Sequence, residues 1–460
     1  MIRYHARWVL PVARPALRDA TVAVEGRHIT WVGPRADAPP GDDDVDLGEA
    51  ILMPGLVNSH THLELTAMRG FLEDLDFSDW ILRLAAAKRR VLSRDDLLDA
   101  ARLGIVEGLH AGITTYADTC DSGVAFDAML EAGVRGVMYQ EVFGPDPAQC
   151  EPSLAELRAK VAALRPRESA LVRAGISPHA PYTVSDALFA ACATLARDER
   201  LPMAVHVAEG VHESELVERA GGIFAEGLRK RGVAVAPRGR SPIELLERTG
   251  VLGVAPLLIH CVRVGDADIA RMRAAGAAVA HCPASNARLG HGIAPLREML
   301  DAGLRVGLGS DSVASNNRMD LLEEARLAAL FQGARTRRAH ALPAGEAIAL
   351  ATLGGARALG LDDRIGTLEP GKEADLAAFA LDRPHAVPVQ EPEAAALHAL
   401  RGTDAAFVAV AGEVRVRDRV LLGGDPALPA RVQDAADRMA AWLEAVRARG
   451  GVVPPRSATR

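Results

Sequence analysis

The 460-residue sequence has few cysteines, no excess of basic residues and no long apolar run. Its cysteines are odd in number and show no CxxC spacing, which argues against a disulfide framework and favours a reducing cytoplasm. No run of about 18 apolar residues occurs, so we expect no membrane span. We expect all five cysteines to be buried free thiols: Cys120, Cys150, Cys192, Cys261 and Cys282.

Several functional classes are also excluded. The net charge of −7 leaves no basic surplus for neutralising phosphates, so we expect no nucleic-acid partner. No Walker loop occurs, and no GxGxxG follows a strand, which argues against a nucleotide cofactor. HESEL at 212–216 lacks the second histidine of the zincin signature, and HCPASN at 281–286 lacks the PCxxC of the small zinc deaminases.

The middle of the chain alternates short apolar runs with amphipathic segments of helical period. Eight strand-like runs in regular alternation with helices predict an α/β fold, a closed parallel (β/α)₈ TIM barrel. The runs lie at 56–60, 112–118, 133–143, 171–179, 202–209, 256–262, 277–283 and 304–311.

Both ends of the chain are rich in short strands and turns, including a hairpin at 20–33. Because domain termini tend to lie close together, they predict one small flanking β-sandwich domain built from both termini. The predicted boundaries are 1–54 and 363–425 for the β-sandwich, 55–362 for the barrel, and 426–460 for a C-terminal helix at 430–448 and a disordered tail.

Ionisable residues recur at the carboxyl ends of the predicted barrel strands, where barrels of this type carry their active sites. A single histidine there is more often a hydrogen-bonded core residue, but a whole set at one end of a barrel favours a functional site. His60 and His62 face the same side, because residues i and i+2 of a strand do. The set is His60, His62, His179, His206, His260, His281 and Asp311.

Three imidazoles and one carboxylate, with a position left open for water, are typical of a catalytic divalent metal site. We predict His60, His62, His206 and Asp311 as its ligands.

Three further roles follow. Glu209 is the predicted general acid/base, and the alternative is a salt-bridging residue at a strand end. His260 is expected to polarise the water, and Asp311 to accept the second proton of that water. His179 and His281 are expected to contact the substrate or to support the ligands.

Several segments resemble the amidohydrolase superfamily, and the resemblance covers nearly the whole chain. It is closest to the branch of methylthioadenosine/S-adenosylhomocysteine deaminases, guanine deaminases and triazine hydrolases. The segments are MPGLVNSHTHLEL, SPHAPYTVSDALF, HVAEG, LLIHCV, AHCPASNARLGHGIAPL, VGLGSDSVASNNRMDLLEEARLA and IGTLEPGKEADLAAFAL.

The resemblance implies a barrel with a flanking β-sandwich and a single metal ion, zinc or alternatively iron. It places metal binding on His60, His62, His206 and Asp311, and proton transfer on Glu209, the same residues as predicted above. His179 stands where binuclear relatives have a bridging lysine, so one metal is expected. The implied reaction is hydrolytic deamination of an aminopurine nucleoside, in which Glu209 delivers a proton to the ring nitrogen and ammonia leaves.

Two departures bear on the substrate. Arg89 stands where adenosine-type deaminases of the branch have a glutamate, and the segment 211–240 is longer than the corresponding segment of those deaminases. Both features are similar to members that deaminate 6-amino-6-deoxyfutalosine on the futalosine route to menaquinone. That substrate carries a benzoate, with which Arg83, Lys88, Arg89 or Arg90 would pair unless they form a solvated helix face. Trp80 and Arg89 are therefore predicted to bind substrate.

Other hypotheses remain open. The runner-up is a methylthioadenosine/S-adenosylhomocysteine or guanine-type deaminase, or a hydrolase of another N-heterocycle. A non-enzymatic alternative is a metal-free scaffold of the same fold. The expected partners are a small N-heterocyclic substrate and, by resemblance, a second copy of the chain in a homodimer, without nucleic acid or membrane.

Overall fold

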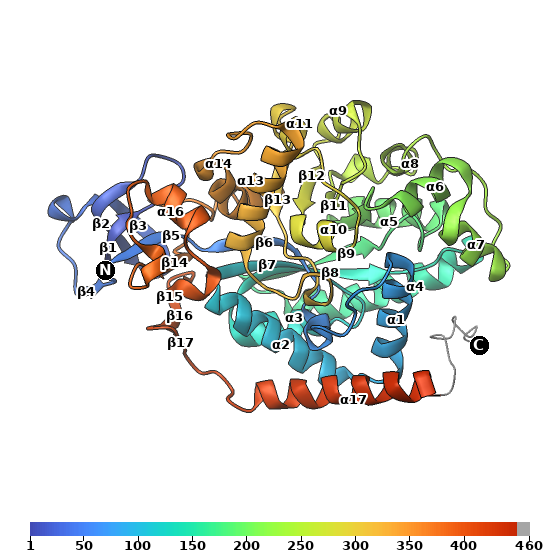
Figure 1. The fold of residues 1–460 in the computed structure, drawn as a ribbon, viewed down its shortest axis with the longest axis horizontal. Helices are drawn as coiled ribbons and strands as arrows, with labels where there is room; N and C mark the ends of the chain where they lie inside the picture. Colours follow the sequence, from blue (N-terminus) through green and yellow to red (C-terminus); the bar gives the residue numbers. More distant parts are fainter. Residues whose placement is uncertain (449–460) are drawn as a thin grey trace.

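The structure is a computed structural model that describes residues 1–448. A barrel with an outer layer of helices forms the larger part, and the strands from both chain ends form the smaller part beside it (Figure 1). The tail at 451–460, predicted to be disordered, lies outside the described residues.

Eight parallel strands form the barrel, and each of the eight predicted runs overlaps one of them. Two four-stranded sheets are joined by the isolated bridges Ile176–Met203 and Thr61–Asp311, so the ring closes on itself and confirms the predicted closed barrel. The strands are β6 (Leu56–Thr61), β7 (Ile113–Cys120), β8 (Arg135–Val142), β9 (Val172–Pro178), β10 (Ala204–Val207), β11 (Leu257–His260), β12 (Ala278–His281) and β13 (Arg305–Leu308).

Helices cover the outside of the barrel and are set by local signals. At the start of α2, Ser93 and Asp96 form a capping box in which each side chain accepts from the other's backbone N–H. The main helices are α2 (Arg94–His110), α3 (Val124–Ala132), α4 (Cys150–Leu164), α5 (Asp186–Glu199), α8 (Pro242–Arg248), α9 (Asp266–Ala274), α11 (Leu296–Asp301), α13 (Leu321–Thr336), α14 (Ala344–Ala349) and α15 (Gly355–Ala358).

The smaller part contains strands from both termini in one sheet, as predicted. The ring centroids of Tyr4 on β1 and Phe407 on β15 lie 5.1 Å apart although two strands separate β1 from β15, so the sheet folds over its own apolar core. The strands are β1 (Ile2–Val9), β2 (Leu17–Glu25), β3 (His28–Pro34), β4 (Asp43–Asp46), β5 (Ala50–Pro54), β14 (Leu376–Ala380), β15 (Ala405–Val410), β16 (Glu413–Arg417) and β17 (Val420–Leu421).

A helix that the sequence did not predict, α16 (Pro392–His398), interrupts the C-terminal strands. It packs on α13 and α14 of the barrel, where Arg326 donates to the carbonyl oxygens of Leu397 and Leu400. A buried ion pair adds a second connection between the two parts. Arg135 at the start of β8 donates to both carboxylate oxygens of Asp375, at 2.9 and 2.8 Å.

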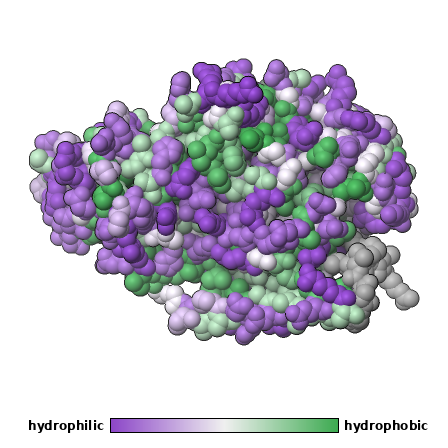
Figure 2. Space-filling model, in the orientation of Figure 1, coloured by the Kyte–Doolittle hydropathy of each residue, from purple (hydrophilic) through white to green (hydrophobic). Residues whose placement is uncertain are grey.

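The C-terminal helix α17 (Leu428–Ala448) lies across α2 and beside α1 (Phe77–Arg90) (Figure 1). Leu428, Val432 and Met439 share an apolar cluster with α1, and Figure 2 shows hydrophobic residues between α17 and the rest of the molecule. Since α1 supplies one wall of the active-site cavity described below, α17 supports that wall from outside.

All five cysteines are free, and four are buried while Cys150 is partly exposed. Within residues 1–448, no helix combines the length and the hydropathy needed to cross a membrane.

Candidate metal centre and active site

The four predicted metal ligands meet at the carboxyl end of the barrel. The Nε2 atoms of His62 and His206 lie 3.3 Å apart, and the Oδ1 atom of Asp311 lies 3.3 Å from Nε2 of His60. Gly309 lets the chain after β13 lie this close to His60, because a Cβ at position 309 would lie only 2.8 Å from the Cβ of His60. The closure of the barrel thus brings together side chains from the strands β6 and β10 and from the loops that follow β6 and β13.

The hydrogen bonds of the histidines fit a cation. Nδ1 of His62 donates to the carbonyl of Thr119 at 2.8 Å, and Nδ1 of His206 donates to that of His179 at 3.1 Å. Each neutral ring then presents an unprotonated Nε2, and the two lone pairs face each other at 3.3 Å. Nε2 of His60 has no hydrogen-bond partner within the described residues. These donor atoms fit a divalent metal with tetrahedral preference.

The protonation states of these side chains also fit a metal site. Burial and the neighbouring His60 lower the pKa of His62 to about 3, so its imidazole is neutral at pH 7. Burial also lowers the pKa of His206 well below its usual value. For Asp311, burial raises the pKa, but the neighbouring His60, with smaller contributions from His260 and His62, outweighs burial and the pKa lies well below the usual range. The site therefore offers neutral imidazoles and one carboxylate, the forms that bind metal.

Asp311 is held in a constrained position. Its backbone has a φ of +56°, in the left-handed region that is uncommon for a residue with a side chain. Its Oδ2 accepts from Ser285 and from Ser315, and its Oδ1 accepts from the backbone N–H of Ser312 at 2.6 Å. His260, with a φ of +74°, shares this strain at the end of β11. Such conformations cluster at functional sites.

Glu209 lies beside the metal ligands. Its Oε1 is 3.5 Å from Nε2 of His260 and 3.3 Å from Nε2 of His291. Glu213 fixes the local backbone, accepting from the N–H groups of Ala208 and Glu209 at 2.8 and 3.1 Å. Burial raises the pKa of Glu209, but His260 and His291 outweigh it and lower the pKa to about 2. Glu209 is therefore an ionised proton acceptor next to the metal position.

The ligands open into a cavity of about 280 Å³. Phe77, Trp80 and Leu84 of α1 form an apolar wall.

The segment 211–240 contributes α6 (Val211–Arg219) and α7 (Gly222–Lys230), and Phe224 of α7 stacks on the cavity-lining Tyr182 with ring centroids 4.2 Å apart. The segment thus backs one wall of the cavity. The apolar walls fit a flat heterocycle.

The predicted substrate-binding residues differ in position. Trp80, Arg89 and His179 line the cavity, and Nδ1 of His179 is 2.8 Å from the hydroxyl oxygen of Thr183. His281 does not line it; the ring is buried, and within the described residues neither ring nitrogen has a hydrogen-bond partner.

The basic residues predicted to bind a carboxylate are also in different environments. Lys88 lines the cavity but donates to Glu64 and Asp121, so its charge is already paired. Arg89 lines the cavity, and within residues 1–448 its guanidinium donates through Nε alone, to the carbonyl of Ala85 at 3.1 Å. Arg83 and Arg90 do not line it. Of these four basic residues, Arg89 is therefore the one whose guanidinium is placed to bind a substrate in the cavity.

The sequence analysis missed His291, Ser285 and Asn286. Asn286 accepts from Nδ1 of His260 at 3.0 Å and so orients that ring. All three lie after β12, and the segment AHCPASNARLGHGIAPL contains them without a spacing that assigns roles.

Comparison with known proteins agrees with this geometry. A 5-methylthioadenosine/S-adenosylhomocysteine deaminase from Desulforudis audaxviator is 35% identical over 91% of this chain and 94% of its own. The structure of an adenosine deaminase from Xanthomonas campestris with bound zinc has a TM-score of 0.86 at 30% identity, covering 96% of this chain and 98% of that one. An atrazine chlorohydrolase from Arthrobacter aurescens complexed with zinc has a TM-score of 0.82 at 27% identity, covering 95% and 100%.

The family model named "Amidohydrolase family" matches residues 51–424, which include the whole barrel. This match confirms the resemblance, the predicted fold class and the prediction of an enzyme. The chain belongs to the amidohydrolase family.

Proposed function

We propose that the protein hydrolyses the exocyclic C–N bond of an aminopurine nucleoside, releasing ammonia. The observation that carries the proposal is the arrangement of Glu209, His260 and Asp311 around the four-ligand centre, in a cavity that has an apolar wall. The similar deaminases support the same reaction class.

His60, His62, His206 and Asp311 would hold one divalent ion, with zinc expected and iron the alternative. Such an ion, when bound, would lower the pKa of water to about 7 and polarise the bond to be broken. Glu209, ionised in the cavity, takes a proton from the attacking water and delivers it to the ring nitrogen. Nε2 of His260 lies 3.5 Å from Oε1 of Glu209. His260 stabilises the negative charge that develops in the transition state.

Two classes of substrate are the finer candidates. 6-Amino-6-deoxyfutalosine, on the futalosine route to menaquinone, is favoured by the unpaired guanidinium nitrogens of Arg89 at the cavity. Methylthioadenosine and S-adenosylhomocysteine are favoured by the names of the similar sequences. A cytoplasmic location, a homodimer and the roles of Trp80, His179 and His281 stay predictions.

A nucleoside panel tests the proposal. We expect the zinc-loaded protein to release one ammonia per product from at least one of aminodeoxyfutalosine, methylthioadenosine, S-adenosylhomocysteine, adenosine and guanosine. Turnover of a chlorotriazine with no ammonia from any nucleoside would instead support a hydrolase of another N-heterocycle and contradict the proposal.

Arg89 gives a substrate-specific prediction. If its guanidinium binds the benzoate, Arg89→Gln removes one charged hydrogen bond and raises KM for aminodeoxyfutalosine by about 10-fold or more, while KM for methylthioadenosine is unchanged. Arg90→Gln, one residue along α1 and outside the cavity lining, is the matched control. Equal effects of Arg89→Gln on both substrates would show that Arg89 is not a carboxylate-binding residue.

A further inference from the structure

His291 lies in a loop between α10 (Pro283–Arg288) and α11 and has no role in the site as predicted from the sequence. It stands between Gly290 and Gly292, whose φ angles of +73° and +105° suit glycine. These two glycines let the loop turn sharply on both sides of the ring. The side chain is 6% exposed, and within the described residues Nε2 has no hydrogen-bond partner, although Oε1 of Glu209 lies 3.3 Å from it.

The ring is fixed on two sides. It meets the cavity-lining Phe77 edge to face, with centroids 4.7 Å apart and planes at 79°. On another side it lies over Gly210, where a Cβ would be 2.8 Å from Nδ1 of His291. Gly210 directly follows Glu209, so the ring packs against the backbone that carries the catalytic carboxylate.

Two imidazoles converge on one oxygen of that carboxylate. Oε1 of Glu209 is 3.3 Å from Nε2 of His291 and 3.5 Å from Nε2 of His260. Asn286 anchors both rings: its side chain accepts from Nδ1 of His260, and its carbonyl accepts from the backbone N–H of His291 at 2.9 Å. Both imidazoles face Oε1, so Oε2 is left for proton transfer.

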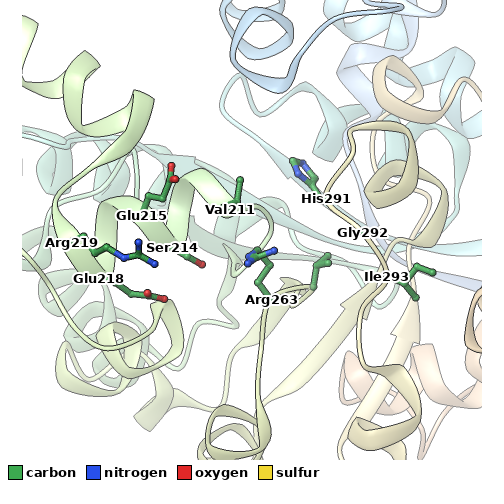
Figure 3. A pocket seen from close by; sticks show the side chains of 10 residues that line it. Val211, Ser214, Glu215, Glu218, Arg219, Arg263, His291, Gly292 and Ile293 are labelled. Carbon is green, nitrogen blue, oxygen red and sulfur yellow. The ribbon is translucent and has the colours of Figure 1, made fainter. Parts of the chain in front are cut away.

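His291 also borders solvent on its far side. It lines a second cavity of about 490 Å³ together with Arg263, Ser214 and Glu218 (Figure 3). In Figure 3 its ring stands on the loop at one end of this cavity, across from the side chains of α6. The ring therefore separates Glu209 from a space that small molecules can enter.

We propose that His291 is a positioning residue that holds Glu209 in its reactive orientation by donating from Nε2 to Oε1. This role rests on the proposed function, because Glu209 must be the proton-transfer group. It needs no contact between His291 and the substrate, so binding of the substrate should be almost independent of His291.

The test uses the zinc-loaded protein with its best nucleoside. We expect His291→Ala to lower kcat by about 10²-fold with KM nearly unchanged, since a misplaced group costs about that much. Added imidazole, entering through the second cavity, should restore part of kcat, and His291→Gln, which keeps a donor, should lose less. His398→Ala, at an exposed histidine on α16, is the control and should keep full activity.

A double variant separates positioning from general destabilisation. In the Glu209→Gln background, His291→Ala should cause no further loss, because the residue acts only through Glu209. The proposal would be overturned if the losses in kcat of the two substitutions multiply in the double variant, or if His291→Ala leaves kcat unchanged. It would also be overturned if neither added imidazole nor glutamine at position 291 restores kcat.

A crystal structure of His291→Ala gives a readout that needs no substrate. The side chain of Glu209 should change its rotamer while the four metal ligands stay in place; an unmoved carboxylate would overturn the proposal. If the wild-type protein releases no ammonia from any nucleoside, the proposed function fails, and this crystal structure alone then decides the role of His291.

Discussion

Glu209→Gln should lower kcat by about 10²–10⁴-fold, the range that a general acid/base contributes. The amide is nearly the same size, so the cavity keeps its shape, but it cannot take a proton from water and pass it to the ring nitrogen. Zinc content should stay at one per chain, because Glu209 is not among the predicted ligands. The measurement is steady-state ammonia release together with metal analysis of the same samples.

Glu156→Gln is the matched control, since Glu156 is exposed on α4 and pairs with Lys160. It should keep wild-type kcat. A Glu209→Gln variant with more than about a tenth of wild-type kcat would remove Glu209 from the proton-transfer role. Loss of zinc from that variant would instead indicate that Glu209 helps to hold the metal.

His206→Ala should abolish detectable turnover, because it removes one of three imidazoles around the metal position. Without a bound ion, water at pH 7 is a poor nucleophile, so we expect kcat to fall by at least about 10⁴-fold. Zinc content should fall well below one per chain. Heat stability should fall as well, since a ligand that binds only the folded chain at 100 times its Kd stabilises it by about 2.7 kcal/mol.

The control for His206→Ala is His385→Ala, in the smaller part of the molecule, where His385 pairs with Asp404 at 2.8 Å. That variant should keep its zinc and its activity. Circular dichroism shows whether each variant is folded before the metal is measured. Full zinc occupancy in folded His206→Ala protein would contradict the assignment of His206 as a ligand.

The barrel and the meeting of the four proposed ligands could be predicted because both follow from periodicity. Side chains two residues apart on a strand share a face, and parallel strands bring their carboxyl ends to one rim. His60, His62, His206 and Asp311 therefore meet where the strand pattern predicts. His281 shows the limit of this rule, because a strand end alone does not fix whether the ring enters the cavity.

The residues that the sequence did not predict depend on contacts between distant segments. Lys88 is paired because α1 crosses the rim where Glu64 and Asp121 lie after two neighbouring strands. His291 reaches Glu209 through a glycine-flanked loop whose path is set by packing on Phe77. Neither contact has a periodicity or spacing that could be detected in the sequence.

We propose that one metal site of three histidines and one aspartate supports deamination. The most direct measurement is a zinc titration of the metal-free protein, with ammonia release followed at each addition from the nucleoside turned over fastest. We predict that activity rises in proportion to bound zinc and saturates at one zinc per chain. Activity in the metal-free protein that added zinc does not increase, or saturation only at two zinc ions per chain, would contradict the account.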